Sequence, residues 1–338
     1  MRYDVTHVTV YDWGSTVPFA DCRLRLTPIE RRRQRVHASR LVIEPTPDLV
    51  VDEVDFFGNH VTRIAFRAPH HRLTLRATAT VSVAPTTLPL ASPPWEEVRR
   101  LAALSKSLDA DDPVHFLFPS RQVLLAPAVT AWAAESFPAG RPVAEAVLAL
   151  TRRIHDEFRY APGTTDVATP LAEAFEARRG VCQDFAHVMI AGLRGLGLPA
   201  AYVSGYLRTL PPPGQPRLAG ADATHAWVEV WCGPAVGWLG FDPTNGILTS
   251  DDHIVTSLGR DYADAAPVVG VLRTAGAQGL AVAVDVVESP APAPTAATPP
   301  AATQAQAPAA TQAQTQTQAA PAAAQPITTT GVPIGTGA

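Results

Sequence analysis

The chain of 338 residues is long enough for about two domains, each with its own hydrophobic core. Hydrophobic residues make up 46% of it and the formal net charge is −4, values typical of a soluble globular protein. This mild acidity gives no reason to expect a nucleic acid or an anionic membrane as a partner. The three cysteines, Cys22, Cys182 and Cys232, are too few and too scattered to predict a disulfide framework.

The location of the protein is predicted from its first residues and its hydropathy. Residues 1–6 lack the apolar segment of a secretory signal, and no apolar run is long enough to span a bilayer. We therefore expect a cytoplasmic protein whose cysteines can stay free thiols.

Residues 1–86 predict a β-rich first domain. Apolar and polar residues mostly alternate along five segments, which is the period of half-buried strands. These segments are Thr6–Tyr11, Arg23–Leu26, Leu41–Ile43, His60–Phe66 and Leu73–Val83.

Residues 87–142 predict a connector that packs on the next domain, because proline-rich breaks alternate there with short helical stretches at 95–108 and 126–135. Residues 143–158 then place apolar side chains at helical spacing. A further helix is expected from Pro170 to Arg179. Thr169 suits its N-cap, and Gly180 suits the position just beyond its C-terminus.

The next helix is predicted to begin at or beside Cys182. Six residues fall on one apolar stripe, and Gly197 with Pro199 ends the helix. The stripe comprises Phe185, Val188, Met189, Gly192, Leu193 and Leu196. Strands are expected at 200–207, 225–231 and 237–241, so residues 143–288 predict an α+β core.

Residues 289–338 consist almost entirely of Ala, Pro, Thr and Gln. Such a segment cannot bury enough apolar surface to offset its ordering entropy, so we expect it to be disordered. A tether to a partner is the alternative that its composition leaves open.

The position of Cys182 suggests chemistry. At a helix N-terminus the unpaired backbone N–H groups and the helix dipole favour a thiolate. The same N–H groups can stabilise an oxyanion on a carbonyl that the sulfur attacks. One location would therefore serve both nucleophile activation and transition-state stabilisation.

A histidine and an aspartate follow on the predicted strands. If the last two strands form a hairpin that pairs Trp231 with Gly237, His225 falls opposite Pro243 and next to Asp242. A cysteine, a histidine and a carboxylate are the parts of a thiol nucleophile with its base and orienting group. The alternatives are a structural histidine and a turn-capping aspartate.

A metal site is the competing interpretation of the same residue types. Cys182 and His187 lie five residues apart on the predicted helix and would point to different faces. No CxxC, HExxH, phosphate-binding glycine loop or GxSxG motif occurs in the sequence. We therefore expect no metal and no cofactor.

Several motifs resemble those of the bacterial transglutaminase-like superfamily. They are Arg179–Ala186 (RGVCQDFA), Tyr202–Tyr206 (YVSGY), Asp222–Trp227 (DATHAW), Gly237–Asn245 (GWLGFDPTN) and Gly259–Tyr262 (GRDY), with Arg25–Pro28 and Phe57–Asn59 in the first domain. Thr224 stands where serine is frequent in the family. The likeness covers nearly everything except the tail.

This resemblance implies a papain-like α+β core and a peptide or protein substrate. It implies Cys182 as nucleophile, His225 as general base and acid, and Asp242 as the group that orients the imidazole. Tyr160 is our candidate for a second oxyanion donor. Gln183 and Trp227, beside the proposed nucleophile and base, are further candidates for oxyanion or substrate contacts.

The reaction is left open by the residues alone. A thioester on Cys182 gives hydrolysis with water and transamidation with an amine; we favour hydrolysis, because nothing in the chain suggests the calcium sites of regulated animal transglutaminases. A non-catalytic binding or scaffold module with the same fold is the second interpretation. Acyl transfer from coenzyme A is the third and the least favoured.

Overall fold

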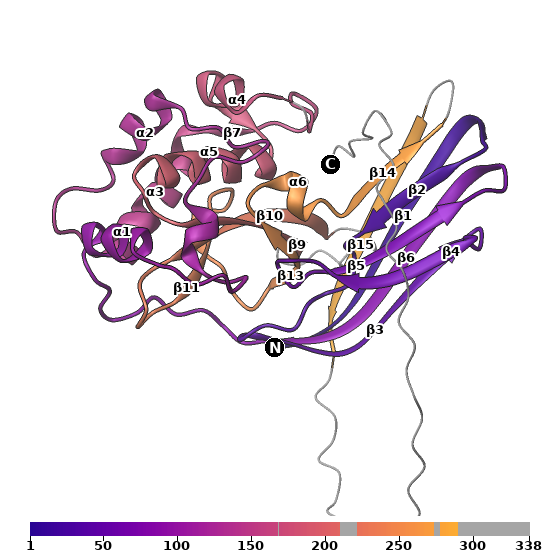
Figure 1. Cartoon of the computed structure of the whole chain (residues 1–338), viewed down its shortest axis with the longest axis horizontal. Coiled ribbons are helices and arrows are strands. Elements are labelled where there is room, and N and C mark those ends of the chain that lie inside the picture. Colours follow the sequence, from indigo (N-terminus) through magenta and orange to yellow (C-terminus); the bar gives the residue numbers. More distant parts are fainter. Residues whose placement is uncertain (168, 210–221, 274–277, 290–338) are drawn as a thin grey trace, which may run out of the picture. The chain divides into compact units, whose positions relative to one another are not determined.

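The computed structural model describes residues 1–167, 169–209, 222–273 and 278–289 (Figure 1). The proline-rich loop at 211–214 and the tail from residue 290 onward lie outside these described residues. Within them the chain forms an α+β fold, with a β-rich N-terminal region followed by a core of helices and an antiparallel sheet, as the sequence predicts. No helix in the described ranges is long and apolar enough to cross a membrane.

Two four-stranded antiparallel sheets build the β-rich region. Their strands pair in the orders β15-β1-β6-β3 and β14-β2-β5-β4. The first sheet comprises β15 (Gln278–Glu288), β1 (Arg2–Val17), β6 (His70–Val83) and β3 (Gln34–Glu44). The second comprises β14 (Val268–Leu272), β2 (Ala20–Leu24), β5 (His60–Phe66) and β4 (Leu49–Val54). The two sheets face each other, because their inward side chains form one buried cluster that includes Trp13, Leu24, Ile64, Phe66 and Leu75.

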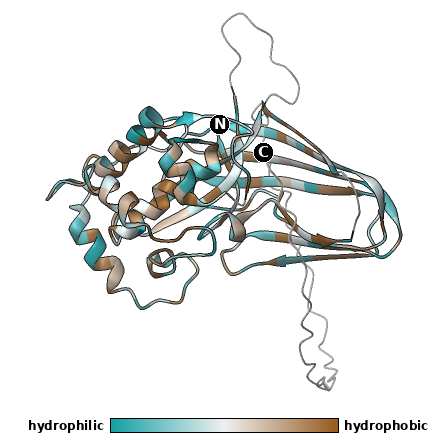
Figure 2. Cartoon of the chain, turned by 90° about the horizontal axis from the view of Figure 1, so that it is seen from above, coloured by the Kyte–Doolittle hydropathy of each residue, from teal (hydrophilic) through white to brown (hydrophobic). Residues whose placement is uncertain are grey.

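Hydrophobic and hydrophilic residues alternate along these long strands (Figure 2). The alternation explains why most of the strands are predictable from sequence. Three strands of these sheets, β4, β14 and β15, are not predicted from the sequence. In β4 the reason is exposure. All six of its residues are exposed, so burial imposes no period-2 pattern on them.

The last two strands come from a part of the chain that the sequence analysis assigns to the core. The sequence predicts that residues 143–288 belong to the core, yet β14 pairs with β2, and β15 pairs with β1 over eleven residue pairs. In Figure 1 these orange strands lie beside the indigo N-terminal ones. The sequence analysis predicts no strand at either place, and the sheet that a strand joins depends on long-range pairing.

The five predicted helices of the connector and core are present in the described residues, and two further short ones are not predicted from the sequence. Together they are α1 (Trp95–Ala103), the short 3₁₀ helix η1 (Pro113–Phe116), α2 (Pro127–Ala134), α3 (Val143–Glu157), α4 (Leu171–Ala177), α5 (Cys182–Gly195) and α6 (Tyr262–Ala265). Helix α1 ends earlier than expected, at Ala103. Helix α4 ends at Ala177, because Arg178 adopts a left-handed conformation with φ of 49°.

Gly180 therefore is not the residue just beyond α4. It lies in the two-residue strand β8 (Arg179–Gly180), which pairs in parallel with β7 (Arg159–Tyr160). This small ladder leads the chain directly into α5.

A five-stranded antiparallel sheet supports the core helices. It comprises β12 (Ile247–Leu248), β11 (Trp238–Asp242), β10 (Ala223–Trp231), β9 (Ala200–Leu207) and β13 (His253–Gly259), in that order. Helix α5 packs on β9 and β10. Its fully buried Arg194 donates to the carbonyls of Phe116, Ala200 and Arg260, which satisfies a charged group inside the core.

The β-rich region and the core sheet are joined by polar and apolar contacts. Arg31 donates to both carboxylate oxygens of Glu229 on β10, at 3.0 and 2.8 Å. Tyr3 and Val284 of the first sheet share a buried cluster with Tyr206 and Ile254 of the core sheet. Strands β1 and β15 thereby reach the side of the core where Cys182 lies.

Candidate active site

Cys182 is the first residue of α5, and its neighbours explain why the helix begins there. The backbone N–H of Val181 donates to Asp184 Oδ2 at 2.8 Å, and the hydroxyl of Thr165 donates to the same oxygen at 2.7 Å. A Cβ on Gly180 would overlap this carboxyl group. Glycine at 180 and aspartate at 184 therefore fix the N-terminus of the helix, and with it the sulfur.

His225 on β10 and Asp242 at the end of β11 are in direct contact. The distance from His225 Nε2 to Asp242 Oδ2 is 2.9 Å. The predicted pairing of Trp231 with Gly237 is wrong by one residue, because Trp231 pairs with Trp238 and Val228 with Phe241.

The turn causes this shift in register. Gly237 has a φ of 75° and donates its N–H to the Gly233 carbonyl, so it belongs to the turn and not to the ladder. Continuing the observed register places Asp242 opposite Trp227. Since residues two apart on a strand share a face, Asp242 and His225 lie on the same face of the sheet, which the predicted register would not allow.

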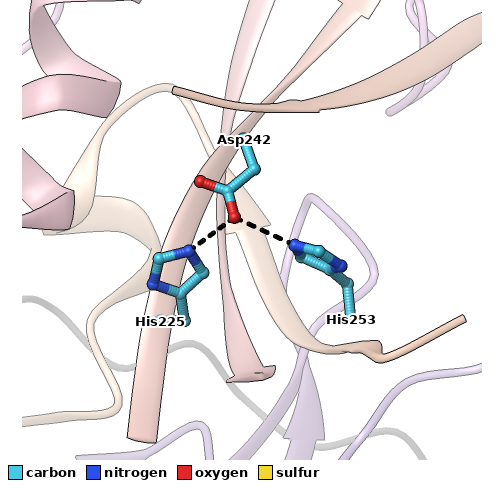
Figure 3. Close-up of side chains that lie close together, drawn as sticks. All are labelled: His225, Asp242 and His253. Atoms are coloured by element: carbon cyan, nitrogen blue, oxygen red, sulfur yellow. Dashed lines mark hydrogen bonds and ion pairs between the residues drawn. The ribbon is translucent and has the colours of Figure 1, made fainter. Parts of the chain in front are cut away.

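The carboxylate of Asp242 is fully buried and accepts five hydrogen bonds. Its Oδ1 accepts from the backbone N–H groups of Thr244 and Asn245, at 2.9 and 3.2 Å. Its Oδ2 accepts from Asn245 Nδ2 at 2.6 Å and faces Nε2 of both His225 and His253 (Figure 3). The Asp-Pro-Thr-Asn segment thus wraps one carboxyl group that has no access to water.

His253 is absent from the sequence-based set of site residues. It is the first residue of β13, 11 positions after Asp242, and its Nε2 lies 3.1 Å from Asp242 Oδ2. No motif in the sequence brings His253 to the site. Only the pairing of β13 with β9, on the far side of β10, places it there.

The charges of this cluster follow from its hydrogen bonds. Burial disfavours a charged His225, but its hydrogen bond with Asp242 and the nearby negative charges of Asp242 and Cys182 outweigh burial and raise its pKa to about 10. Burial would raise the pKa of Asp242, but the hydrogen bonds from His225 and His253 hold it well below its usual range. An ionised carboxylate beside an imidazolium is therefore favoured at neutral pH.

Cys182 and His225 line the same cavity, of about 80 Å³. Gln183 lines this cavity too. The opposite wall comes from the β-rich region, through residues of β1 and β15 such as Thr9, Leu280 and Val282. The cleft is therefore built by two regions of the chain.

Two other predicted site residues lie differently. Trp227 is 1% exposed and packs edge-on against His253, with ring centroids 5.2 Å apart, so it is not on the surface of the cleft. Tyr160 is 52% exposed and makes an edge contact with Phe185 of α5. Burial and the nearby charge of Cys182 raise the pKa of Tyr160, so its hydroxyl stays a neutral donor.

His187, the other histidine of α5, has a structural environment. Its Nε2 accepts from the backbone N–H of Tyr262 at 3.2 Å, and burial lowers its pKa to about 4. It is a neutral acceptor in the core, apart from the cluster around Asp242.

Comparison with known proteins adds two family matches. Residues 3–82 match the bacterial transglutaminase-like N-terminal region, and residues 130–243 match the transglutaminase-like superfamily. An uncharacterized protein of Mycobacterium tuberculosis is 41% identical over 295 residues, which are 85% of this chain and 92% of that protein. A Mycobacterium leprae protein is 31% identical over 84% of this chain and 98% of its own length.

Two further comparisons concern proteins with descriptive names. A Pseudomonas aeruginosa protein-glutamine gamma-glutamyltransferase is 37% identical over 107 residues, which are 31% of this chain and 16% of that protein. A solved structure from Cytophaga hutchinsonii, named a "putative cysteine protease", superposes with a TM-score of 0.65 over 86% of this chain and 92% of that one. At 23% identity the latter shows a shared fold.

Proposed function

Because the chain belongs to the bacterial transglutaminase-like superfamily, we propose that it is a cysteine-dependent enzyme that cleaves amide bonds through a thioester. The observation that carries this proposal is the position of His225, which hydrogen-bonds Asp242 and lines the same cavity as Cys182. A thiol nucleophile, a histidine base and a carboxylate that orients the histidine are the parts of a catalytic triad.

In the first step the proton shared by Cys182 and His225 lies on the imidazole, and the Cys182 sulfur attacks the carbonyl carbon of an amide as a thiolate. A tetrahedral oxyanion forms, which backbone N–H groups at the start of α5 are placed to stabilise. When it collapses, the C–N bond breaks, the imidazolium protonates the departing nitrogen, and an acyl group remains on sulfur as a thioester.

In the second step an acceptor attacks the thioester, and His225 takes the proton of that acceptor. Water releases a carboxylic acid and regenerates the Cys182 thiol. We favour water as the acceptor, which makes the protein a protease or amidase. An amine acceptor would form a new amide bond instead, and the Pseudomonas relative named a glutamyltransferase favours this as the second candidate.

The substrate that we propose is a peptide or protein chain. The cleft is lined by apolar side chains on both walls, including Val181, Val268 and Val282, with a few hydroxyl groups among them. An extended chain crossing between the core and the β-rich region would contact both walls.

The reactivity of the three cysteines tests the proposal directly. Burial raises the pKa of Cys22 and Cys232 to about 12, so these two thiols are built-in controls. Iodoacetamide at pH 7 should alkylate Cys182 first, as peptide mapping would reveal. The rate should fall in His225→Ala and stay unchanged in Cys22→Ala. Equal alkylation of Cys182 in wild type and His225→Ala would contradict an activated thiol and favour a binding module.

Product analysis separates the two reactions. Peptides incubated with and without a labelled primary amine are analysed by mass spectrometry, with Cys182→Ala as the control. Cleaved or deamidated peptide without label supports hydrolysis, and labelled peptide supports transamidation. Products that form equally with Cys182→Ala would refute the enzymatic proposal.

A further inference from the structure

Two histidines approach the same oxygen of Asp242. His225 Nε2 lies 2.9 Å from Oδ2 and His253 Nε2 lies 3.1 Å from it, and the two imidazoles meet the carboxylate from different strands (Figure 3). The mechanism above uses only His225. His253 is 3% exposed, and such a buried ring beside a carboxylate calls for its own explanation.

The tautomer of His253 is fixed by its other nitrogen. The backbone N–H of Ser250 donates to His253 Nδ1 at 3.1 Å, and the Ser250 hydroxyl lies 3.4 Å from the same atom. A ring nitrogen that accepts a backbone hydrogen bond carries no proton, so the proton of the neutral ring is on Nε2. His253 therefore donates to Asp242.

The same contact argues against a metal ion. One donor atom from each of His225, Asp242 and His253 lies within 4.8 Å of the others, which is close enough to consider a cation. A histidine that binds metal through Nε2 carries its proton on Nδ1 and donates it to a second partner. Here that proton would face the N–H of Ser250, so two donors would oppose each other.

His253 stands apart from the cleft that holds Cys182. It lines a second cavity, of about 530 Å³, together with Ser250 and Trp227, and the cleft walls do not include it. The buried ring of Trp227 packs against it edge-on. A substrate on Cys182 would thus be out of reach of His253, and its influence has to pass through Asp242.

We propose that His253 is a positioning residue, whose Nε2–H holds the Asp242 carboxylate in the orientation that lets it bind His225. This inference rests on the proposed function for its effect on rate, although its hydrogen-bonding pattern is independent of it. The titratable groups that face the two rings are Asp242 and, beyond His225, Cys182.

Three substitutions separate the parts of this role. His253→Gln places an amide N–H near the position of Nε2, His253→Asn offers an acceptor near Nδ1 but does not reach Asp242, and His253→Leu offers neither. We expect His253→Gln to keep kcat within about 3-fold of wild type. The other two should lose roughly 10- to 100-fold in kcat with little change in KM, the size of one lost hydrogen bond to a charged group.

Nuclear magnetic resonance gives a readout that needs no activity. Long-range ¹H–¹⁵N spectra of the whole chain should show His253 protonated at Nε2 and not at Nδ1. The Nε2–H signal of His225 should move in His253→Leu and stay in place in His253→Gln. Thermal unfolding of each variant identifies any that does not fold, and the wild-type spectrum remains informative in that case.

Each outcome bears on the inference. Rescue by glutamine alone supports it. Equal loss in His253→Gln and His253→Leu would point to a need for the imidazole itself, as in a metal site, and would overturn it. Wild-type kcat in all three variants, or a proton on Nδ1, would overturn it too. If wild type forms no product and Cys182 is unreactive, the proposed function fails while the tautomer measurement still decides the hydrogen bond.

Discussion

Two buried histidines, one in each region of the molecule, have pKa values that are shifted in opposite directions. His7 in the β-rich region forms hydrogen bonds with the hydroxyl groups of Tyr206 and Thr9, and burial lowers its pKa to about 4. His225 in the core is buried to a similar degree, yet its pKa is raised to about 10. Burial alone therefore does not decide the charge; an anionic partner within hydrogen-bond distance does.

Replacing Asp242 should give His225 an uncharged environment like that of His7. This substitution has the largest effect that we predict. In Asp242→Asn the negative charge disappears, so burial should lower the pKa of His225 from about 10 to below 6.5. Product formation should fall by about 10⁴-fold, as when the carboxylate of a triad becomes an amide. Kinetics with the best peptide substrate and an NMR titration of His225 measure the two effects.

A second buried aspartate provides the control. Asp112 accepts from the Val114 N–H at 2.9 Å and from the Ser105 hydroxyl, away from the cleft. Asp112→Asn should leave the rate within a few-fold of wild type. Similar losses in both variants would mean that general destabilisation, and not the charge on Asp242, explains the result.

The site residues differ in how well the sequence predicts their positions. Cys182 can be located because local signals, a glycine, a helix start and an apolar stripe, surround it. Asp242 and His225 are found through their motifs, but the predicted register would have put them on opposite faces. The left-handed Gly237 moves the pairing by one residue, and the sequence contains no independent sign of which glycine of the turn does so.

His253 and the strands β14 and β15 illustrate what local patterns cannot provide. Neither strand is predicted from the sequence, and pairing between distant segments decides which sheet a strand joins. His253 reaches Asp242 only because β13 pairs with β9. Gln183 and Trp227 show the same limit of local patterns. Both lie near proposed catalytic residues in the sequence, but Gln183 lines the cleft and Trp227 is buried in the core.

Acidification should lower the free energy of unfolding, because two buried histidines are neutral in the folded chain. The pKa of His7 and His187 is about 4 in the folded chain, below the unfolded value of 6.5, so the unfolded chain binds more protons in this window. Stability should fall as pH drops from 6.5 towards 4, by up to about 1.4 kcal/mol per pH unit for each histidine.

Urea unfolding at pH 7 and pH 5 measures how the free energy of unfolding depends on pH. His7→Gln should reduce this dependence, because it removes one of the two neutral histidines. The contribution of His225 to stability should depend on pH in the opposite direction. Its folded pKa of about 10 lies above 6.5, so its contribution is present below pH 6.5 and is lost as pH rises towards 10. A slope between pH 7 and 5 that His7→Gln leaves unchanged would show that His7 is not kept neutral.

The smallest predicted effect compares one glycine from each region. Gly205 pairs with His225, and a Cβ there would overlap the Ile254 carbonyl and the ring of Trp227 that borders both histidines. Gly279 of β15 would place a Cβ at an ordinary 3.6 Å from the nearest atom. Gly205→Ala should therefore cost about 1–3 kcal/mol in the free energy of unfolding and lower the rate, and Gly279→Ala should stay within about 0.5 kcal/mol. Urea unfolding of both variants measures these losses. An equal loss of free energy of unfolding in the two variants would mean that the close packing around His225 does not stabilise the fold.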